Sequence, residues 1–246
     1  MADDLRAFDG WFNPANWPVS TCPTCKLGQL MLKDPVTIIE GTQSKNARDH
    51  EDWDPDWING YFQGVLRCGR SGCGEIVLAT GEWAVTWDPN GQYSDVLRLR
   101  FAIPALPLAV PPTGTPLEVI DRIDEASRVV WSDPASAANG LRRAVESLLD
   151  AQKVRKTAGN GRRTKLSTHA RIEEFKAKRP VAAQSLMAVK WVGNQGSHGV
   201  SELTPTDCIE SAEYLDHALR DLYDRRDADI VKRVKKVNKS RRIQRP

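Results

Sequence analysis

The sequence predicts an α+β protein in which a small β module precedes a helical domain. Short runs rich in Val, Ile, Leu, Trp and Tyr dominate the chain before residue 104, and helical periodicity dominates it after residue 116. Two cysteine pairs in the first part indicate that a metal ion stabilises the β module. We therefore expect four parts: a zinc-binding β module over residues 1–103, a proline-rich linker over 104–116, a helical domain over 117–230 and a basic tail over 231–246.

Four segments of the first part have the composition of strands. Leu97, Leu99 and Phe101 alternate with arginines, which is typical of a strand with one solvated face. Asp88-Pro-Asn-Gly91 is a turn sequence, so we expect the segments on either side of it to form a hairpin. The predicted strand segments are residues 30–40, 60–67, 75–87 and 94–103.

The composition and the motifs that the chain lacks exclude several classes of protein. The sequence has no apolar run long enough to span a membrane, and its acidic, polar start differs from a secretory signal. We therefore expect a cytoplasmic protein without a membrane contact. The chain also lacks a phosphate-binding Gly-rich loop, a dinucleotide fingerprint, a nucleophile elbow and a paired His–Glu metal motif.

The two cysteine pairs are the strongest chemical signal of the sequence. Cys22-Pro-Thr-Cys25 and Cys68-Gly-Arg-Ser-Gly-Cys73 each place two thiols on one tight turn, and four thiolates suit structural Zn²⁺. We expect Cys22, Cys25, Cys68 and Cys73 to bind Zn²⁺ in a closed, structural site. Four nearby glycines can adopt the positive φ angles that such turns need, namely Gly28, Gly69, Gly72 and Gly74.

Other interpretations of the cysteines remain open at this point. They could be reduced thiols, or two disulfides, which a cytoplasmic protein disfavours. His50 could also replace one thiol as a ligand. Cys208, in the last predicted helix, is expected to be a core residue rather than a nucleophile.

Five helices are expected after the linker. Asp133-Pro134 has the form of an N-cap followed by proline in the first helical turn. His169 and His217 lie alone on their helices, so we interpret them as surface or core residues. The helices are residues 117–130, one that begins at Pro134, one from Ser167 that ends at Pro180, residues 181–192, and one from Thr206 to about Val237.

Two motifs in the second half carry a resemblance to a known family. Leu141-Arg-Arg-Ala-Val-Glu-Ser-Leu-Leu149 contains Arg-Arg-x-x-Glu, and Val189-Lys-Trp-Val-Gly-Asn-Gln-Gly-Ser-His198 contains Gly-Asn-x-x-x-His. With a closing helix from Asp207 to Tyr223, they resemble the bacterial domain of unknown function 4145 family over about residues 117–225. The resemblance implies an all-α, HEPN-like bundle (higher eukaryotes and prokaryotes nucleotide-binding). Such bundles usually dimerise, and many are metal-independent endoribonucleases of phage defence and toxin systems.

The resemblance also implies a catalytic site. HEPN ribonucleases use an arginine, a polar residue and a histidine; Asn194 and His198 match the last two, whereas Gly193 stands where the arginine is expected. Lys190, one turn earlier, could supply the cation. The histidine would accept the proton of a ribose 2′-hydroxyl while the cation stabilises the phosphate. The alternative is that Gly193, Asn194 and Gly196 end a helix and catalyse nothing.

Basic residues suggest contacts to nucleic acid. Residues 232–245 include eight Lys or Arg and no acidic residue, and a second basic run surrounds Gly159-Asn-Gly161. The tail has no aromatic residue, so its contacts should be independent of base sequence. The candidate nucleic-acid ligands are Arg142, Arg143, Lys232, Arg233, Lys235, Lys236, Arg241 and Arg242. The alternatives are a solvated tail and an ordinary surface pair of Arg142 with Glu146.

The sequence is thus compatible with two functions. The first is a nucleic-acid-directed protein of the bacterial or phage defence or toxin type, a homodimer that acts on RNA as an endoribonuclease if Lys190, Asn194 and His198 are catalytic. The second is a non-catalytic, dimerising protein-interaction module with a structural zinc site. For this second function, the acidic loop that contains Trp53 and Trp57 is a candidate binding patch. Alternatively, that loop is solvated and its two tryptophans pack on the β module.

Overall fold

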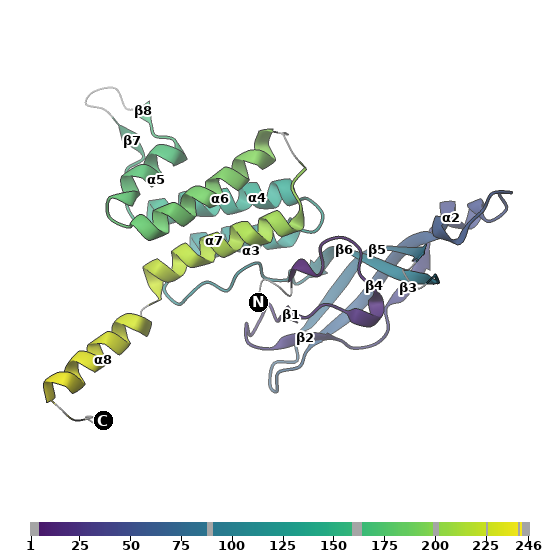
Figure 1. Ribbon diagram of the computed structural model, residues 1–246, viewed down its shortest axis with the longest axis horizontal. Helices are drawn as coiled ribbons and strands as arrows, with labels where there is room; N and C mark the ends of the chain where they lie inside the picture. The colour runs from purple at the N-terminus through teal and green to yellow at the C-terminus, as the bar shows by residue number, and fades with distance from the viewer. Residues whose placement is uncertain are drawn as a thin grey trace.

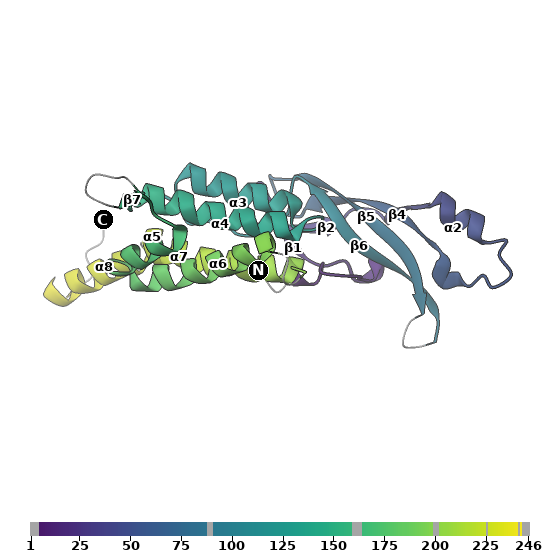
Figure 2. The same cartoon turned by 90° about the horizontal axis from the view of Figure 1, so that it is seen from above.

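The predicted α+β architecture is confirmed by the computed structural model, in which a curled antiparallel sheet precedes a group of helices (Figure 1). The structure describes residues 5–87, 91–158, 164–198, 202–224, 226–240 and 242, without the side chains of 196–198, 226–229 and 231. Sheet and helices lie side by side, and the N-terminal segment lies close to their junction (Figures 1 and 2). Among the described helices, none combines the length and apolar character needed to cross a membrane.

The sheet has six antiparallel strands in the order β1-β2-β4-β5-β6, and β3 pairs with the far end of β4. Pairing of β5 with β6, from Leu78 opposite Ile103 to Trp87 opposite Tyr93, confirms the predicted hairpin; residues 88–90 of its turn lie outside the described residues. The strands are β1 (Ser20–Thr21), β2 (Gln29–Leu32), β3 (Thr37–Glu40), β4 (Asn59–Cys68), β5 (Ile76–Trp87) and β6 (Tyr93–Ile103). Short helices lie between them: η1 (Pro14–Asn16), α2 (Thr42–Ala47) and η2 (Pro55–Trp57).

The segment predicted as one strand over residues 30–40 forms two separate strands, β2 and β3. Pro35 lies between them and cannot donate a backbone hydrogen bond to a neighbouring strand, so the ladder is interrupted there. The two strands then pair with different parts of β4: Leu30 lies opposite Cys68, whereas Ile39 lies opposite Tyr61.

The helices form two layers, with α3 and α4 in one and α6 and α7 in the other (Figure 2). Asp133 caps α4 as predicted, because its carboxylate accepts a hydrogen bond from the Ser136 amide at 2.9 Å. The helices are α3 (Leu117–Val129), α4 (Pro134–Ala151), α5 (Thr168–Lys176), α6 (Pro180–His198), α7 (Pro205–Tyr223) and α8 (Arg226–Ser240). A small hairpin of β7 (Thr157–Ala158) and β8 (Thr164–Lys165) precedes α5.

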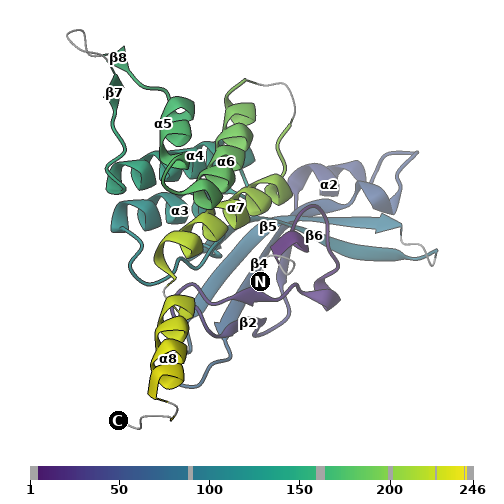
Figure 3. The same ribbon diagram turned by 60° about the vertical axis from the view of Figure 1, so that its left-hand side comes forward.

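The final helix differs from the prediction, because the segment from Thr206 to about Val237 contains two helices. Asp224, after the end of α7, has an extended conformation with φ −77° and ψ 106°. The six residues that follow Tyr223, Asp-Arg-Arg-Asp-Ala-Asp, include five charged side chains, so they do not continue the buried apolar face of α7. Helix α8 therefore projects away from the other helices (Figures 1 and 3).

The N-terminal segment joins the two halves of the molecule. The Phe8 ring is 1% exposed and packs edge-on against Phe12 of the same segment, at 5.5 Å, and against Trp131 at the end of α3, at 5.7 Å. Arg6 forms an ion pair with Glu213 of α7 at 2.8 Å. The buried residues of both halves consequently form one continuous cluster.

The proline-rich segment between β6 and α3 also contributes to this shared core. Leu106, Leu108 and Ala109 are buried. The Leu108 amide donates a hydrogen bond to the Ser127 hydroxyl of α3 at 3.1 Å, and this hydroxyl donates to the Ile123 carbonyl at 2.8 Å. The backbone of the segment is thereby fixed against α3.

Truncation of Phe8 tests the importance of this junction. Phe8→Ala removes a ring that touches both halves, so we expect the free energy of unfolding to fall by about 3–5 kcal/mol, measured by urea denaturation. Trp11→Ala in the same segment is the control, since Trp11 is 48% exposed and its loss should change stability by at most about 0.5 kcal/mol. Equal effects of the two variants would contradict a junction centred on Phe8.

Candidate metal centre and basic cleft

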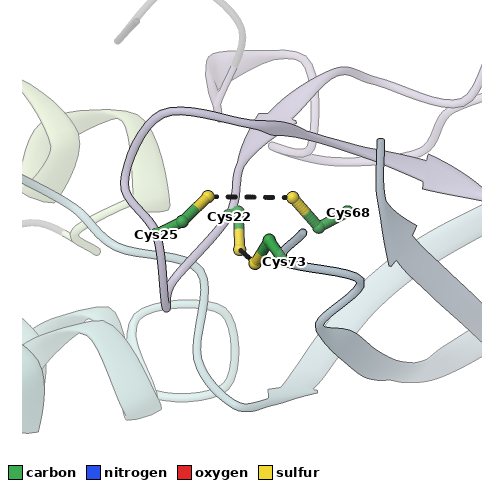
Figure 4. A group of neighbouring side chains, drawn as sticks. All are labelled: Cys22, Cys25, Cys68 and Cys73. Atoms are coloured by element: carbon green, nitrogen blue, oxygen red, sulfur yellow. Dashed lines mark hydrogen bonds between the residues drawn. The ribbon is translucent and has the colours of Figure 1, made fainter. Parts of the chain in front are cut away.

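The sheet brings the two cysteine pairs together. Cys22 and Cys25 lie in the turn between β1 and β2, Cys68 ends β4, and Cys73 lies in the turn before β5. Because β2 pairs with the end of β4, both turns lie at the same end of the sheet. All four sulfur atoms lie within 4.8 Å of one another, and the Cys22–Cys73 and Cys25–Cys68 sulfur distances are both 3.8 Å (Figure 4).

These distances fit a metal ion and exclude the two disulfides. In a tetrahedral site with Zn–S bonds of about 2.3 Å, sulfur atoms lie about 3.8 Å apart. A disulfide needs about 2.05 Å between its sulfur atoms. The cluster is therefore a candidate metal site with four thiol ligands, as predicted. His50 lies apart from it, stacked against Trp57 with 5.4 Å between the ring centroids.

Gly28 is needed for space in the first turn, rather than for the positive φ angle that the sequence suggested. A Cβ atom at this position would lie 2.4 Å from the Cys68 sulfur. The Gly28 amide also donates a hydrogen bond to the Cys25 sulfur at 3.2 Å. The positive φ of this turn belongs to Lys26, at 57°, whereas Gly72 and Gly74 have the expected positive angles of 80° and 64°.

Backbone groups and burial act in opposite directions on the thiols. A hydrogen bond from the Leu27 backbone, with a smaller contribution from Gly28, lowers the pKa of Cys25 to about 6. Burial raises the pKa of Cys22. A cation among the four sulfur atoms would favour the thiolate form of each.

Cys208 lies outside the cluster and is a buried core residue, as predicted. Its thiol donates a hydrogen bond to the Pro134 carbonyl, and burial raises the pKa of the thiol to about 12.

A cleft of about 730 Å³ lies between α4, α5 and α6. It brings together three residues that the sequence singled out: Arg142 from α4, and Lys190 and Asn194 from α6. It also contains His169, which the sequence left as an isolated histidine. The residues that line it are Arg142, Glu146, Lys165, Leu166, Ser167, Thr168, His169, Arg171, Lys190 and Asn194.

Helix α6 continues through the Gly-Asn motif. It ends only at His198, so the alternative in which Gly193, Asn194 and Gly196 terminate the helix is wrong. His198 follows Asn194 by four residues, and Asn194 follows Lys190 by four, so the three positions share one face of α6. The side chain of His198 lies outside the described residues.

The structure explains why glycine occupies position 193. A Cβ atom there would lie 2.7 Å from the Arg142 Cβ and 3.0 Å from the Ala138 carbonyl oxygen. An arginine at this position would therefore collide with α4. The cations of the cleft come instead from Lys190 and from Arg142 of the facing helix.

Lys190 is a buried cation without an acidic partner. The residue is only 8% exposed, and burial, with a smaller effect of Arg142, lowers its pKa. Its ammonium lies 3.1 Å from the centroid of the Trp191 ring. Among the described residues, no carboxylate lies within ion-pair distance of it. Within this part of the chain, the Trp191 ring stabilises the ammonium, which also borders the cleft.

The one carboxylate that lines the described cleft is already engaged. Glu146 accepts hydrogen bonds from Arg142 at 3.3 Å and from the Thr168 hydroxyl at 2.7 Å. Ser167 caps α5, so the positive end of this helix also faces the cleft. The cleft can therefore accept an anion.

The other predicted nucleic-acid ligands lie elsewhere. Arg143 faces α3 and lies 3.7 Å from Glu125, so it does not line the cleft. Arg242 is exposed, and Arg241 lies outside the described residues. Four further residues are exposed along α8, namely Lys232, Arg233, Lys235 and Lys236. The second basic run is partly neutralised, since Lys156 pairs with Asp150 at 2.7 Å.

The chain is thus an α+β protein that joins a four-cysteine β module to helices with a basic cleft. Residues 124–244 match the family model described as "Domain of unknown function (DUF4145)", which confirms the resemblance to that family. Residues 11–101 match the model described as "Domain of unknown function (DUF8608)". No curated protein and no solved structure matches the chain. The cysteine cluster lies within residues 11–101 and the cleft within residues 124–244.

Proposed function

We propose that the helical half binds nucleic-acid phosphates in the cleft between α4, α5 and α6, as part of a nucleic-acid-directed protein of the bacterial or phage defence or toxin type. The observation that carries this proposal is Lys190, a residue only 8% exposed that lines the cleft and whose ammonium has no carboxylate within ion-pair distance among the described residues. Burial of an unpaired charge is costly, so a cation that is kept in such a place is usually matched by a ligand. A phosphate is the anion that best suits its neighbours.

The groups around Lys190 favour a phosphate in particular. Arg142 has a planar, multidentate guanidinium that matches phosphate oxygens, and it would exchange its hydrogen bonds to Asn139 and Glu146 for bonds to the phosphate. The first turn of α5 adds backbone amides and the positive end of the helix dipole. The basic residues of α8 would add attraction that does not depend on base sequence. Together these groups are suited to bind the phosphodiester backbone of a nucleic acid.

If the protein also cleaves RNA, His198 is the residue expected to act as the base. It would accept the proton of a 2′-hydroxyl, while Lys190 and Arg142 stabilise the charge that develops on the phosphate. Asn194, one turn before His198 on the same face, would orient the substrate. This is the endoribonuclease function implied by the resemblance, and no metal ion takes part in it.

Substitution of Lys190 tests the cleft. Lys190→Gln should weaken binding of a short fluorescein-labelled RNA about tenfold and lower the slope of log affinity against log salt by about one, measured by fluorescence anisotropy. The matched control is Lys176→Gln, whose ammonium is exposed on α5 beside Glu173.

For cleavage, His198→Ala should abolish the formation of RNA fragments yet leave binding intact.

One outcome would contradict the proposed binding site, and another would contradict cleavage alone. If the Lys190→Gln variant binds RNA as tightly as the unaltered protein, the cleft is not the binding site. Intact RNA after prolonged incubation with unaltered protein that binds it would restrict the function to binding.

For the four cysteines, we propose Zn²⁺ as the bound metal and a structural role for it. Four thiolates at tetrahedral spacing are typical of structural zinc sites, which keep no open position for a substrate. The ion would join the β1–β2 turn to the β4–β5 turn and stabilise the sheet between them.

Metal analysis tests the zinc site. The purified protein should contain about one zinc per chain, and Cys68→Ser should remove the metal and lower the midpoint of thermal unfolding. Gly28→Ala keeps all four thiols but intrudes on the Cys68 sulfur, so it too should lower the zinc content. Cys208→Ala is the control and should retain the metal. Full thermal stability of zinc-free protein would rule out a structural role.

A second candidate function, a protein-interaction module, is favoured by the open face of the sheet. Leu78 lies between Val65 and Ile103 in the strand register, and Leu78 and Ile103 are 55% and 66% exposed. Ile76 and Phe101, on the same face of the sheet, are also exposed. Contiguous exposed apolar surface often marks a protein contact. A second copy of the chain is the partner expected.

Analytical ultracentrifugation tests this second candidate. If two chains associate through the open face of the sheet, the double variant Leu78→Lys, Ile103→Lys should dissociate a dimer into monomers with an unchanged circular dichroism spectrum. Leu117→Lys, at a residue that is 72% exposed on α3, should leave the dimer intact. A double variant that stays dimeric would exclude this face as the dimer contact.

A further inference from the structure

Trp191 forms an exposed aromatic surface beside the basic cleft. The residue is 52% exposed, which is unusual for a tryptophan in the middle of a helix that packs against others. Two residues that line the cleft contact its ring: the Lys190 ammonium lies 3.1 Å from the ring centroid, and the His169 ring lies at 5.9 Å in an edge-on arrangement. The ring therefore borders the place where a phosphate would bind.

Two contacts restrict the Trp191 ring. The Lys190 ammonium lies over it, and the His169 ring of α5 contacts it at an interplanar angle of 60°. An exposed ring that is held in this way loses little conformational freedom when a second aromatic group stacks on it. Nucleobases are the aromatic groups that accompany phosphates in nucleic acid.

Only unpaired bases can stack on such a ring. In a duplex each base is covered by its neighbours, and a protein reaches the phosphates alone or the edges of the bases. Proteins that bind single strands combine a cationic groove with exposed aromatic side chains. The cleft has both elements next to each other, since Lys190 belongs to the groove and also touches the ring.

We propose that the cleft selects unpaired nucleotides by stacking a base on Trp191 while Lys190 and Arg142 bind the adjacent phosphate. This inference rests on the proposed binding of phosphates in the cleft, and it specifies that the bound nucleic acid is unpaired. Unpaired stretches of RNA and of DNA offer the same combination of base and phosphate. They differ in the ribose 2′-hydroxyl, which a comparison of the two strands isolates.

The experiment measures the affinity of the full chain for four labelled probes by fluorescence anisotropy: a single-stranded RNA, a DNA strand of the same sequence, the corresponding duplex, and an abasic strand that keeps the phosphates. The unaltered protein should bind the single strand about tenfold more tightly than the duplex or the abasic strand. Trp191→Ala should reduce single-strand affinity to the level of the abasic strand, and Trp191→Phe should restore most of it. Trp87→Ala, at a 60% exposed tryptophan of β5, is the control and should change nothing.

The outcomes separate this inference from the proposal on which it rests. Equal affinity of the unaltered protein for single strand, duplex and abasic strand would overturn base stacking and leave phosphate binding standing. Absence of binding to every probe would overturn both. A uniform loss across all probes in Trp191→Ala and Trp191→Phe would mean that the ring acts only by supporting Lys190, which also overturns stacking. Tighter binding of both single strands than of the duplex and the abasic strand would support stacking. A preference for the RNA strand over the DNA strand would then name RNA as the ligand through its 2′-hydroxyl.

Discussion

The convergence of four sulfur atoms from two turns constrains how the first strands of the β half can lie. β1 and β2 are short, at two and four residues, and so few ladder hydrogen bonds hold a strand pair only weakly. The cysteine cluster joins their connecting turn to the turn that follows β4. Gly28 makes this approach feasible, since any side chain there would enter the space of the Cys68 sulfur.

The features that the sequence predicted correctly are those with local causes. The Asp133 cap and the hairpin of β5 and β6 each depend on residues that are close along the chain. The two cysteine pairs are far apart, but each pair has its own local spacing, and the preference of a metal ion for four thiolates predicts that they meet. The break at Asp224 was missed because the segments on both sides favour a helix, and only the loss of a buried face separates them.

The features that the sequence did not reveal depend on residues far apart in the chain. His169 belongs to the cleft because α5 packs on α6, and no spacing within one motif reveals that contact. Likewise, the motif suggested a missing arginine at Gly193, but the reason for the glycine is the close approach of Arg142 on α4. A sequence pattern identifies candidate residues, whereas packing decides which of them meet.

The junction has a consequence for how such a protein can change over evolution. The two matched regions, residues 11–101 and 124–244, leave out most of the segments that hold the halves together. Phe8 and Arg6 precede the first region, and Leu106 and Leu108 lie between the two. If recombination replaced one matched region with the equivalent region of another protein, the side chains at the junction of the two halves would therefore no longer fit together. The halves are expected to be inherited as a pair, with compensating changes concentrated in the stretches that neither family model covers.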